Sequence, residues 1–485
     1  MARYDFVVLG SGPAGRRAAV QAAKLGKSVL VIDNRARVGG VSVHTGTIPS
    51  KTLRETVLNL SGWRERGFYG RAYRVKKDVD GSDLAARVGK TLEHEIGVLE
   101  HQFGRNGVQT MVGHARFIDP HRIAIADRSG DREIREVVEA DKVLIAVGTM
   151  PYRPANIPFN GTTVLDSDEF IETPHVPGSL TVIGAGVIGL EYATIFSALD
   201  VQVTLIEPRA TILDFMDREI VDHLIHVMRD RGMGLRLSCE LEQIRFGPGG
   251  SPVCMLKDGR QIASDTVLFT AGRIGATSGL GLDACGLEAD SRGRLKVDPR
   301  SYQTTVPHIY AAGDVIGFPS LASTSLEQGR MAACHAFDAA APTPGPSYPI
   351  GIYAVPELSS VGITEEEARA RGAPYECGIA RFGETSRGQI MGISSGMLKL
   401  IVDIASRRVL GVHIIGEGAT ELIHIGQAVI NLGGGLDYFL DNSFNYPTLA
   451  EAYKVAALNV WNRLQQHQDN VVELAAVASG STHAA

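Results

Sequence analysis

Two glycine-rich turns of the pattern Gly-x-Gly-x-x-Gly constrain the fold of this chain more than any other feature of its sequence. The first consists of Gly10, Gly12 and Gly15, which follow a short apolar stretch and open an alanine-rich segment at residues 16–25. A second apolar stretch ends at Asp33, at the spacing expected for an acid that binds ribose hydroxyls. Strand, turn, helix and acid together predict a dinucleotide-binding βαβ unit, with the pyrophosphate at the helix N-terminus.

The same pattern recurs in the second quarter of the chain. Gly184, Gly186 and Gly189 lie between two apolar stretches, and the second of these stretches ends at Glu207. Because each fingerprint comes with its strands, its helix and its acid, the sequence predicts two dinucleotide sites in one chain.

Length and charge limit the number of domains and the classes of partner that this chain can have. A chain of 485 residues suggests about three domains of ~150 residues. The net charge of −6 gives no electrostatic basis for binding nucleic acid or an anionic membrane surface. No apolar run reaches the ~18 residues that a membrane span needs. The N-terminus enters a strand pattern at once and leaves no room for a signal peptide, so we expect a cytoplasmic protein.

The cysteines form no motif. There are five, an odd number, and no two are spaced as Cys-x-x-Cys. They are Cys239, Cys254, Cys285, Cys334 and Cys377. We expect free, reduced thiols and no metal site.

Two further strand-and-glycine segments indicate how the nucleotide domains are connected. The segments that end at Gly148 and Gly272 resemble the crossovers between the two nucleotide domains of a flavoprotein superfamily. The pair Gly313 and Asp314 matches the second FAD motif of that superfamily, in which the acid binds the ribityl chain. The resemblance therefore implies that the first nucleotide domain binds FAD and is interrupted by the second.

The fold class that follows is α/β, with two Rossmann-like domains that bind FAD and NAD(P), and a C-terminal α+β dimer-interface domain. Alternating strand patterns near the C-terminal end favour an antiparallel sheet in the last domain. The expected division is residues 1–149 and 276–346 for FAD, 150–275 for NAD(P), 347–465 for dimerisation, and 466–485 as a flexible tail. A proline-rich linker is expected at residues 339–349.

Residues 39–51 resemble the redox-active segment of the flavoprotein disulfide reductases, such as dihydrolipoamide dehydrogenase and glutathione reductase. Two cysteines of that segment are replaced here by Ser42 and Thr47. A hydroxyl of ordinary pKa does not supply the thiolate that opens a disulfide. We expect Gly40, Ser42 and Thr47 to contribute to the flavin site, and we expect no second redox centre.

Lys51 ends this segment. In the family the lysine lies beside the flavin N5 and pairs with a glutamate just after the second fingerprint, which is Glu191 here. A cation at that place favours the anionic reduced flavin, so the resemblance assigns a catalytic role to both residues.

The C-terminal end lacks a second part of the family's thiol chemistry, the acid–base histidine. Residues 444–451 resemble the His-Pro-Thr-x-x-Glu segment of the family, in which the glutamate holds an acid–base histidine. Tyr446 replaces the histidine, while Glu451 is kept. A phenol with a pKa near ~10 does not relay protons near neutrality as an imidazole does. Tyr446 is therefore either part of the site or an aromatic that packs at the interface.

Nearly the whole chain resembles one branch of the family, the soluble pyridine-nucleotide transhydrogenases. That branch carries Gly-Thr-Ile-Pro-Ser-Lys and Phe-Asn-Tyr-Pro-Thr, as this chain does, but usually keeps the first cysteine, where Ser42 stands here. The resemblance implies reversible hydride transfer between NADPH and NAD through bound FAD, in a homodimer or a higher oligomer. An NAD(P)H:quinone reductase or oxidase of the same fold and a non-catalytic flavin-binding protein are the alternatives.

Two residues at the end of the second fingerprint bear on the choice between NAD and NADP. Glu207 favours the ribose diol of NAD and repels a 2′-phosphate. Arg209, two residues later, offsets that repulsion if it binds the phosphate. The pair suits an enzyme that accepts both nucleotides, and it is equally typical of a surface turn.

Overall fold

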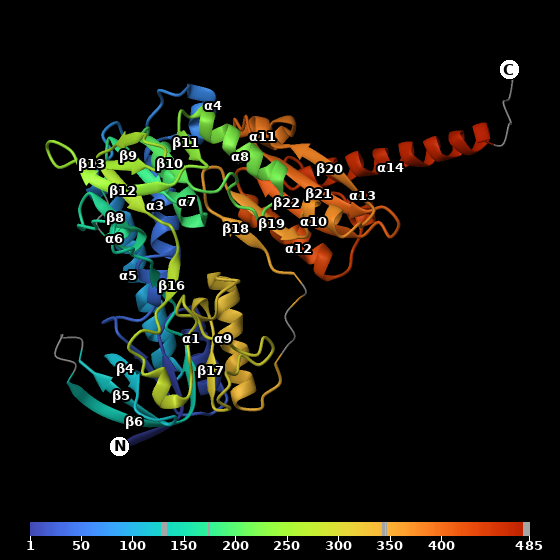
Figure 1. Cartoon of the computed structure of the whole chain (residues 1–485). Helices are drawn as coiled ribbons and strands as arrows, with labels where there is room; N and C mark the ends of the chain where they lie inside the picture. The colour runs from blue at the N-terminus through green and yellow to red at the C-terminus, as the bar shows by residue number, and fades with distance from the viewer. Residues whose placement is uncertain (128–132, 173–174, 342–344, 346, 479–485) are drawn as a thin grey trace.

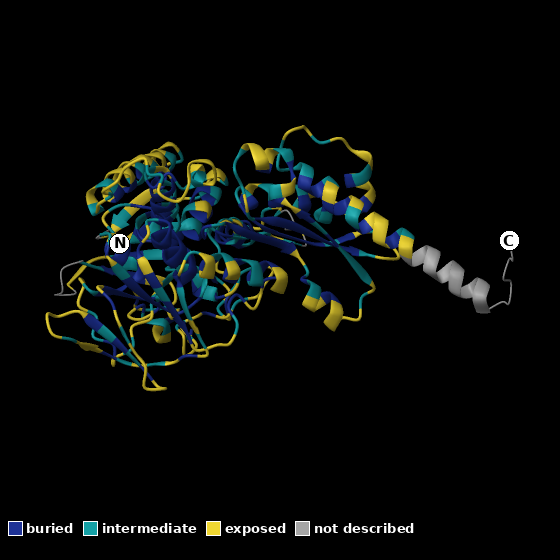
Figure 2. Cartoon of the chain, turned by 90° about the horizontal axis from the view of Figure 1, so that it is seen from above, coloured by how far each residue is buried: buried dark blue, intermediate teal, exposed yellow. Residues whose placement is uncertain are grey.

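The computed structural model of the chain describes residues 1–127, 133–172, 175–341, 345 and 347–478, with side chains described as far as residue 466. Figure 1 shows a sheet that contains the N-terminus at the bottom, a second nucleotide-type sheet at the upper left and the C-terminal sheet at the upper right. Figure 2 shows that the strands at the centre of each body are buried and that the exposed residues lie mostly at the periphery.

The first body is a parallel sheet extended by an antiparallel hairpin and covered by helices. Its strands are β1 (Ala2–Leu9), β2 (Val29–Asp33), β3 (Gln109–Val112), β4 (His114–Phe117), β5 (Arg122–Ala126), β6 (Ile134–Ile145) and β17 (Ile309–Ala311). Its helices are α1 (Pro13–Lys24), α2 (Gly40–His44), α3 (Thr47–Leu60), α4 (Arg66–Tyr69), α5 (Gly81–Arg105) and α9 (Ala322–Ala336).

The order of the strands shows that the first nucleotide unit is discontinuous in sequence. β1 pairs in parallel with β2 and β6, β3 lies beyond β2, and β17 joins β6 on its other edge. The residues at the end of β1, from Phe6 to Leu9, are at most 1% exposed, as expected for a parallel strand covered on both faces. Since β17 comes from residues 309–311, the chain leaves this sheet and returns to it.

The second body repeats the first in smaller form. Its parallel sheet has the order β11-β10-β9-β15-β8, and a three-stranded sheet and a two-stranded ribbon of β7 and β16 accompany it. The strands are β7 (Thr149–Pro151), β8 (Val164–Asp166), β9 (Ser179–Ile183), β10 (Gln202–Glu207), β11 (Gly234–Leu237), β12 (Leu241–Phe246), β13 (Pro252–Leu256), β14 (Gln261–Ala263), β15 (Thr266–Phe269) and β16 (Arg273–Gly275). The helices are α6 (Ser167–Glu172), α7 (Val187–Ser197) and α8 (Arg218–Asp230). The ribbon contains both crossovers between the two bodies, as the glycine segments predict.

The third body is an antiparallel sheet of order β18-β19-β22-β21-β20, packed against helices. Its strands are β18 (Ile350–Ile352), β19 (Leu358–Gly362), β20 (Tyr375–Arg381), β21 (Met397–Asp403) and β22 (Val409–Ile415). Its helices are α10 (Glu365–Ala370), α11 (Ser386–Ile390), α12 (Ala419–Asn431), α13 (Leu436–Asp441) and α14 (Glu451–Ala478). Short 3₁₀ turns elsewhere in the chain are η1 (Trp63–Glu65), η2 (Leu282–Cys285) and η3 (Asp314–Ile316), and η4 (Phe382–Glu384) belongs to the third body.

The predicted fold class, two Rossmann-like domains and a C-terminal α+β domain, is confirmed.

The C-terminal end differs from expectation. The sequence suggests a flexible tail from residue 466, but α14 continues to Ala478 and projects from the third body (Figure 1). Residues 466–478 contain neither glycine nor proline, so the helix has no sequence signal that ends it there. The rest of the expected tail, and residues 342–344 and 346 of the expected linker, lie outside the described residues. Within the described part of the chain, no helix has the length and apolarity needed to cross a membrane.

One buried charge cluster joins the second body to the third. Lys399 of β21 is 1% exposed, and its Nζ lies 3.0 Å from Asp217 at the start of α8, 3.1 Å from Glu219 and 2.5 Å from Glu365. Burial alone raises the pKa of Asp217, but the positive potential of His413 and Lys399 outweighs it, so its pKa is lowered. The stabilisation is therefore present above the ordinary pKa of an aspartate and is lost as the pH falls through the lowered value.

Replacing Lys399 with methionine is expected to lower the free energy of unfolding by about 3–5 kcal/mol, because the buried carboxylate of Asp217 loses its ammonium partner. Urea unfolding followed by circular dichroism measures the loss. The matched control is Lys257→Met, since the Lys257–Glu240 pair is exposed on both sides and is expected to contribute little. A loss at Lys399 no larger than that of the control would contradict the role of the cluster.

Candidate flavin and nicotinamide sites

The three glycines of the first fingerprint have distinct steric roles. A Cβ on Gly10, whose φ is +101°, would lie 2.4 Å from the carbonyl oxygen of Ala146, and one on Gly15 would lie 1.9 Å from that of Gly10. A Cβ on Gly12 would meet nothing closer than Gly40 Cα at 3.9 Å. The outer glycines are therefore required by packing, whereas the middle one faces free space at the N-terminus of α1. That space suits an approaching pyrophosphate.

The second fingerprint has the same arrangement. A Cβ on Gly184, whose φ is +100°, would lie 3.1 Å from Thr270, and one on Gly189 would lie 2.0 Å from the Gly184 oxygen. A Cβ on Gly186 would have no neighbour within 4 Å. The structure thus contains two glycine turns of the same geometry, one in each nucleotide body, with the middle glycine facing open space.

Asp33 ends β2 beside the first turn. Its carboxylate accepts hydrogen bonds from the Ser11 backbone at 2.7 Å, the Ser11 hydroxyl at 2.5 Å and the Arg35 backbone at 2.8 Å. A cavity of about 290 Å³ opens at this strand end. Besides Asp33 it is lined by Val31, Arg35, Ala36, Arg37, Val38, Glu100, Phe103, Gly104, Val108, Thr110, Met111 and Val112. The cavity fits the adenosine half of a dinucleotide.

Glu207 ends β10 at the equivalent place, and it is paired with Arg209. Its carboxylate accepts the Ala185 backbone N–H at 2.7 Å and Arg209 Nε at 2.8 Å. Burial raises the pKa of Glu207, but these hydrogen bonds outweigh it and lower that pKa. The Arg209 side chain is half-exposed, so it is free to turn toward a bound nucleotide.

Asp314 follows the turn at Gly313, whose φ is +85°, and begins η3. Within the described residues, the hydrogen bond to its carboxylate comes from Ser325 at a long 3.4 Å. Burial raises the pKa of Asp314, and the positive charge of Arg273 partly offsets that effect. A partly buried carboxylate with so little hydrogen bonding has capacity for ligand hydroxyls, as a ribityl chain provides.

Gly148 and Gly272 lie in the crossovers beside β7 and β16. Their φ angles are +67° and +113°, and added Cβ atoms would meet nothing within 4 Å. The Gly148 carbonyl accepts the Ala276 N–H at 3.0 Å, and that of Gly272 accepts the Tyr152 N–H at 3.1 Å. Both glycines therefore shape the ribbon that joins the two nucleotide bodies.

The two hydroxyls of the thiol positions lie at successive short helices. Ser42 is buried in α2 and donates to the Gly39 carbonyl at 3.1 Å, and Thr47 begins α3. Gly40 starts α2 against the first fingerprint, since its Cβ would lie 2.7 Å from Gly12 Cα. The redox segment therefore lies against the glycine turn, with hydroxyls in place of thiols.

The predicted pair of Lys51 and Glu191 is formed between α3 and α7. Lys51 Nζ donates to both carboxylate oxygens of Glu191, at 2.7 and 2.9 Å, and lies 4.9 Å from the ring centroid of Tyr353. The side chain of Glu191 is 5% exposed and that of Lys51 is 26% exposed. Glu191 also accepts the Tyr353 N–H at 2.9 Å. The carboxylate thus fixes the ammonium while leaving part of it accessible.

Tyr446 and Glu451 are not brought together. Tyr446 is 69% exposed, and its hydroxyl lies 2.5 Å from Ser386 Oγ. The Glu451 Oε2 atom is buried and has no hydrogen-bond partner among the described residues. The glutamate therefore does not hold the residue that replaces the histidine.

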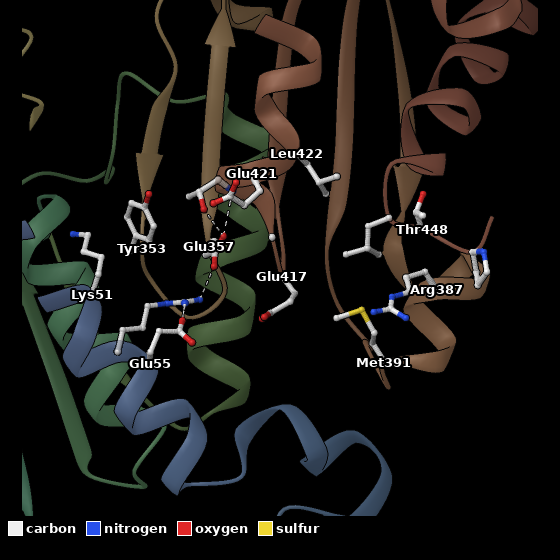
Figure 3. Close-up of a pocket in the computed structure, with 15 residues that line it drawn as sticks. Lys51, Glu55, Tyr353, Glu357, Arg387, Met391, Glu417, Glu421, Leu422 and Thr448 are labelled. Atoms are coloured by element: carbon white, nitrogen blue, oxygen red, sulfur yellow. Dashed lines mark hydrogen bonds and ion pairs between the residues drawn. The ribbon is translucent and has the colours of Figure 1, made fainter. Parts of the chain in front are cut away.

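Within one chain, Lys51 and the 446–451 segment lie on opposite sides of a groove of about 780 Å³. Figure 3 shows Lys51 and Tyr353 on one side, Glu421 and Leu422 between, and Arg387, Met391 and Thr448 on the other. The groove is lined by Lys51, Arg54, Glu55, Tyr353, Glu357, Arg387, Met391, Glu417, Gly418, Thr420, Glu421, Leu422, Pro447, Thr448 and Leu449. Sequence reasoning missed Arg54, Tyr353 and Glu357, because they belong to no local motif.

Comparisons with known proteins agree with this geometry. The family model of the pyridine nucleotide-disulphide oxidoreductases matches residues 4–329, and the model of their dimerisation domain matches residues 348–457. A soluble pyridine nucleotide transhydrogenase of Mycobacterium bovis is 50% identical over 467 residues, 96% of this chain and 98% of that protein. One of Yersinia enterocolitica is 42% identical, over 95% and 98%.

Solved structures give the same result. LpdA of Mycobacterium tuberculosis is similar with a TM-score of 0.85 and 26% identity, covering 94% of this chain and 99% of that one. The HOCl-induced flavoprotein disulfide reductase RclA of Escherichia coli has a TM-score of 0.83 and 27% identity, covering 94% and 100%. The chain belongs to the pyridine nucleotide-disulphide oxidoreductase family.

Proposed function

We propose that this chain is an FAD-dependent transhydrogenase that moves hydride reversibly between NADPH and NAD. The observation that carries the proposal is the intact Lys51–Glu191 pair beside a redox segment with Ser42 and Thr47 in place of thiols. The two relatives at 50% and 42% identity, both named soluble pyridine nucleotide transhydrogenase, support it. Exchange between two nicotinamide pools fits a cytoplasmic protein.

The residues of the first body fit FAD. When bound, FAD accepts a hydride from one nicotinamide nucleotide and gives it to another. The open space at Gly12 takes the pyrophosphate, Asp33 takes the adenosine ribose, and Asp314 takes the ribityl hydroxyls. Each of these groups has room or hydrogen-bonding capacity that the protein itself leaves unused.

Lys51 provides the positive charge of the site. Its ammonium is fixed by Glu191 and stands at the joint of the two nucleotide bodies, where a flavin and a nicotinamide meet in this fold. A fixed cation stabilises negative charge that develops on the flavin ring without the cost of reorganising solvent.

The remaining residues argue against a disulfide step. Ser42 and Thr47 supply neither a nucleophilic thiolate nor its partner. Tyr446 is an exposed phenol bound by Ser386, and the buried Oε2 of Glu451 has no hydrogen-bond partner among the described residues. Hydride that enters the site therefore leaves by the nicotinamide side or passes to another acceptor.

Nucleotide selection is assigned to the end of β10. Glu207 is buried, accepts the Ala185 N–H and suits the ribose diol of NAD, and Arg209 suits the 2′-phosphate of NADP. Since each residue now binds the other, either nucleotide has to displace part of this ion pair.

The assembly is proposed to be a homodimer through residues 347–465. The match of residues 348–457 to a dimerisation domain supports it. The Tyr446 segment of one copy would then complete the groove beside Lys51 of the other.

The division into FAD residues 1–149 and 276–346 and NAD(P) residues 150–275 is supported by the return of β17 to the first sheet.

Steady-state kinetics test the proposed reaction. Because donor and acceptor use one nicotinamide site in turn, NADPH and an NAD analogue should give parallel double-reciprocal lines. Lipoamide and oxidised glutathione, as controls, should be reduced no faster than by free flavin. Intersecting lines would refute the shared site, and turnover of a quinone with none of NAD would favour the reductase alternative.

Lys51→Ala should retain FAD but lower kcat on the order of 10²-fold, because a preorganised charge is lost while the pyrophosphate contacts remain. The flavin midpoint potential should become more negative, as measured by dye equilibration. Asp314→Ala serves as the contrasting variant, since it should weaken FAD retention. An unchanged potential in Lys51→Ala would remove the lysine from the flavin site.

Glu207→Ala should raise the KM for NAD about tenfold, since a charged hydrogen bond to the diol is lost. Arg209→Ala should instead raise the KM for NADPH by a similar factor. Initial rates with each nucleotide varied separately measure both. Equal effects of either substitution on the two nucleotides would show that this turn does not select between them.

A further inference from the structure

The lysine–glutamate pair is supported by a segment of the third body. Residues 353–357 connect β18 to β19 and run beside α7. The Tyr353 N–H donates to Glu191 at 2.9 Å, and the Val355 N–H donates to the Thr194 hydroxyl at 3.0 Å. Glu191 and Thr194 stand three residues apart on the same face of α7. The carboxylate that orients Lys51 is therefore itself oriented by this segment.

Arg54 ties the same segment to α3, the helix that carries Lys51. It follows Lys51 by three residues, and its side chain is 3% exposed. Nε donates to the Ala354 carbonyl at 3.1 Å, Nη2 lies 3.1 Å from Glu357 Oε1, and Nη1 lies 2.7 Å from Glu55 Oε1. All three nitrogens are therefore engaged, two of them on residues 353–357.

The connection continues beyond Glu357. Its second carboxylate oxygen accepts the Thr420 N–H at 3.2 Å and the Thr420 hydroxyl at 2.8 Å, at the start of α12. Figure 3 shows Lys51, Tyr353, Glu55 and Glu357 on the same side of the groove, with Glu357 toward the start of α12. A continuous set of hydrogen bonds thus runs from Lys51 through α7 and residues 353–357 to the groove.

Stability alone does not account for this arrangement. Burying a guanidinium and a carboxylate costs desolvation that their attraction scarcely offsets, so such a pair adds little net stability. What a rigid guanidinium with three engaged nitrogens does supply is orientation. Arg54 ties α3 to residues 353–357, and the same residues bind Glu191, the partner of Lys51.

We propose that Arg54 is a positioning residue for Lys51, which it holds against Glu191 through its bonds to Ala354 and Glu357. The inference rests on the proposed function, in which Lys51 stands beside the flavin. Its expected signature is a change in flavin behaviour without loss of the cofactor.

The test compares Arg54→Met, Arg54→Lys and a control, Arg64→Met, in the FAD-loaded enzyme. Arg64 shares Glu55 with Arg54 and also binds Glu417, but among the described residues it makes no hydrogen bond or ion pair to residues 353–357. Arg54→Met should shift the flavin midpoint potential in the same direction as Lys51→Ala and lower kcat about tenfold, with KM within a factor of ~2 and FAD retained. Arg54→Lys should recover part of both, and Arg64→Met should change neither.

Glu357→Gln keeps the experiment decisive if Arg54→Met folds poorly. The amide retains a hydrogen bond to Thr420 and removes the charge that Arg54 meets, so it should give a smaller shift in the same direction. A potential that moves in Lys51→Ala but in neither Arg54→Met nor Glu357→Gln would overturn the positioning role alone. A potential that Lys51→Ala itself leaves unchanged would remove Lys51 from the flavin site, which is the part of the proposed function on which that role rests.

Discussion

The ion pair between Lys51 and Glu191 is the interaction on which the rest of the site depends. It joins α3 of the first nucleotide body to α7 of the second, so the relative position of the two bodies and the position of the ammonium are set together. Glu191 is almost fully buried, and a buried carboxylate is stable only with partners. It obtains them from Lys51 and from the Tyr353 backbone of the third body. One carboxylate therefore contacts residues of all three bodies of the chain.

The chain lacks both the thiols and the base that disulfide reduction requires. A disulfide reductase needs two thiols and a base, and this chain has Ser42, Thr47 and Tyr446 at those places. Around Tyr446 the hydroxyl is bound by Ser386, while Glu451 has a buried oxygen without a hydrogen-bond partner among the described residues. What is kept is the part that positions nucleotides and a cation. The chain therefore keeps the residues that we propose for hydride exchange and has hydroxyls at the two thiol positions of the family.

Much of this organisation is predictable from local sequence. The glycine turns, the acids that follow them and Lys51 belong to short motifs whose spacing reflects backbone geometry, and the fold class follows from them. Arg54 belongs to no such motif, because its partners Ala354 and Glu357 are about 300 residues away in the chain. The sequence also does not predict the length of α14. Residues 466–478 are small and polar enough to suggest a tail, but they contain no residue that ends a helix. Contacts between distant segments, and helix ends without a stop signal, are what the sequence alone does not specify.

The most direct test of hydride exchange follows the hydride itself. Enzyme reduced with one equivalent of NADPH deuterated at the transferred position, freed of NADP and mixed rapidly with NAD, should recover its oxidised flavin absorbance and yield deuterated NADH in equal amount. Flavin that is bleached by NADPH, remains reduced with NAD and is reoxidised only by a quinone or by oxygen would contradict the account.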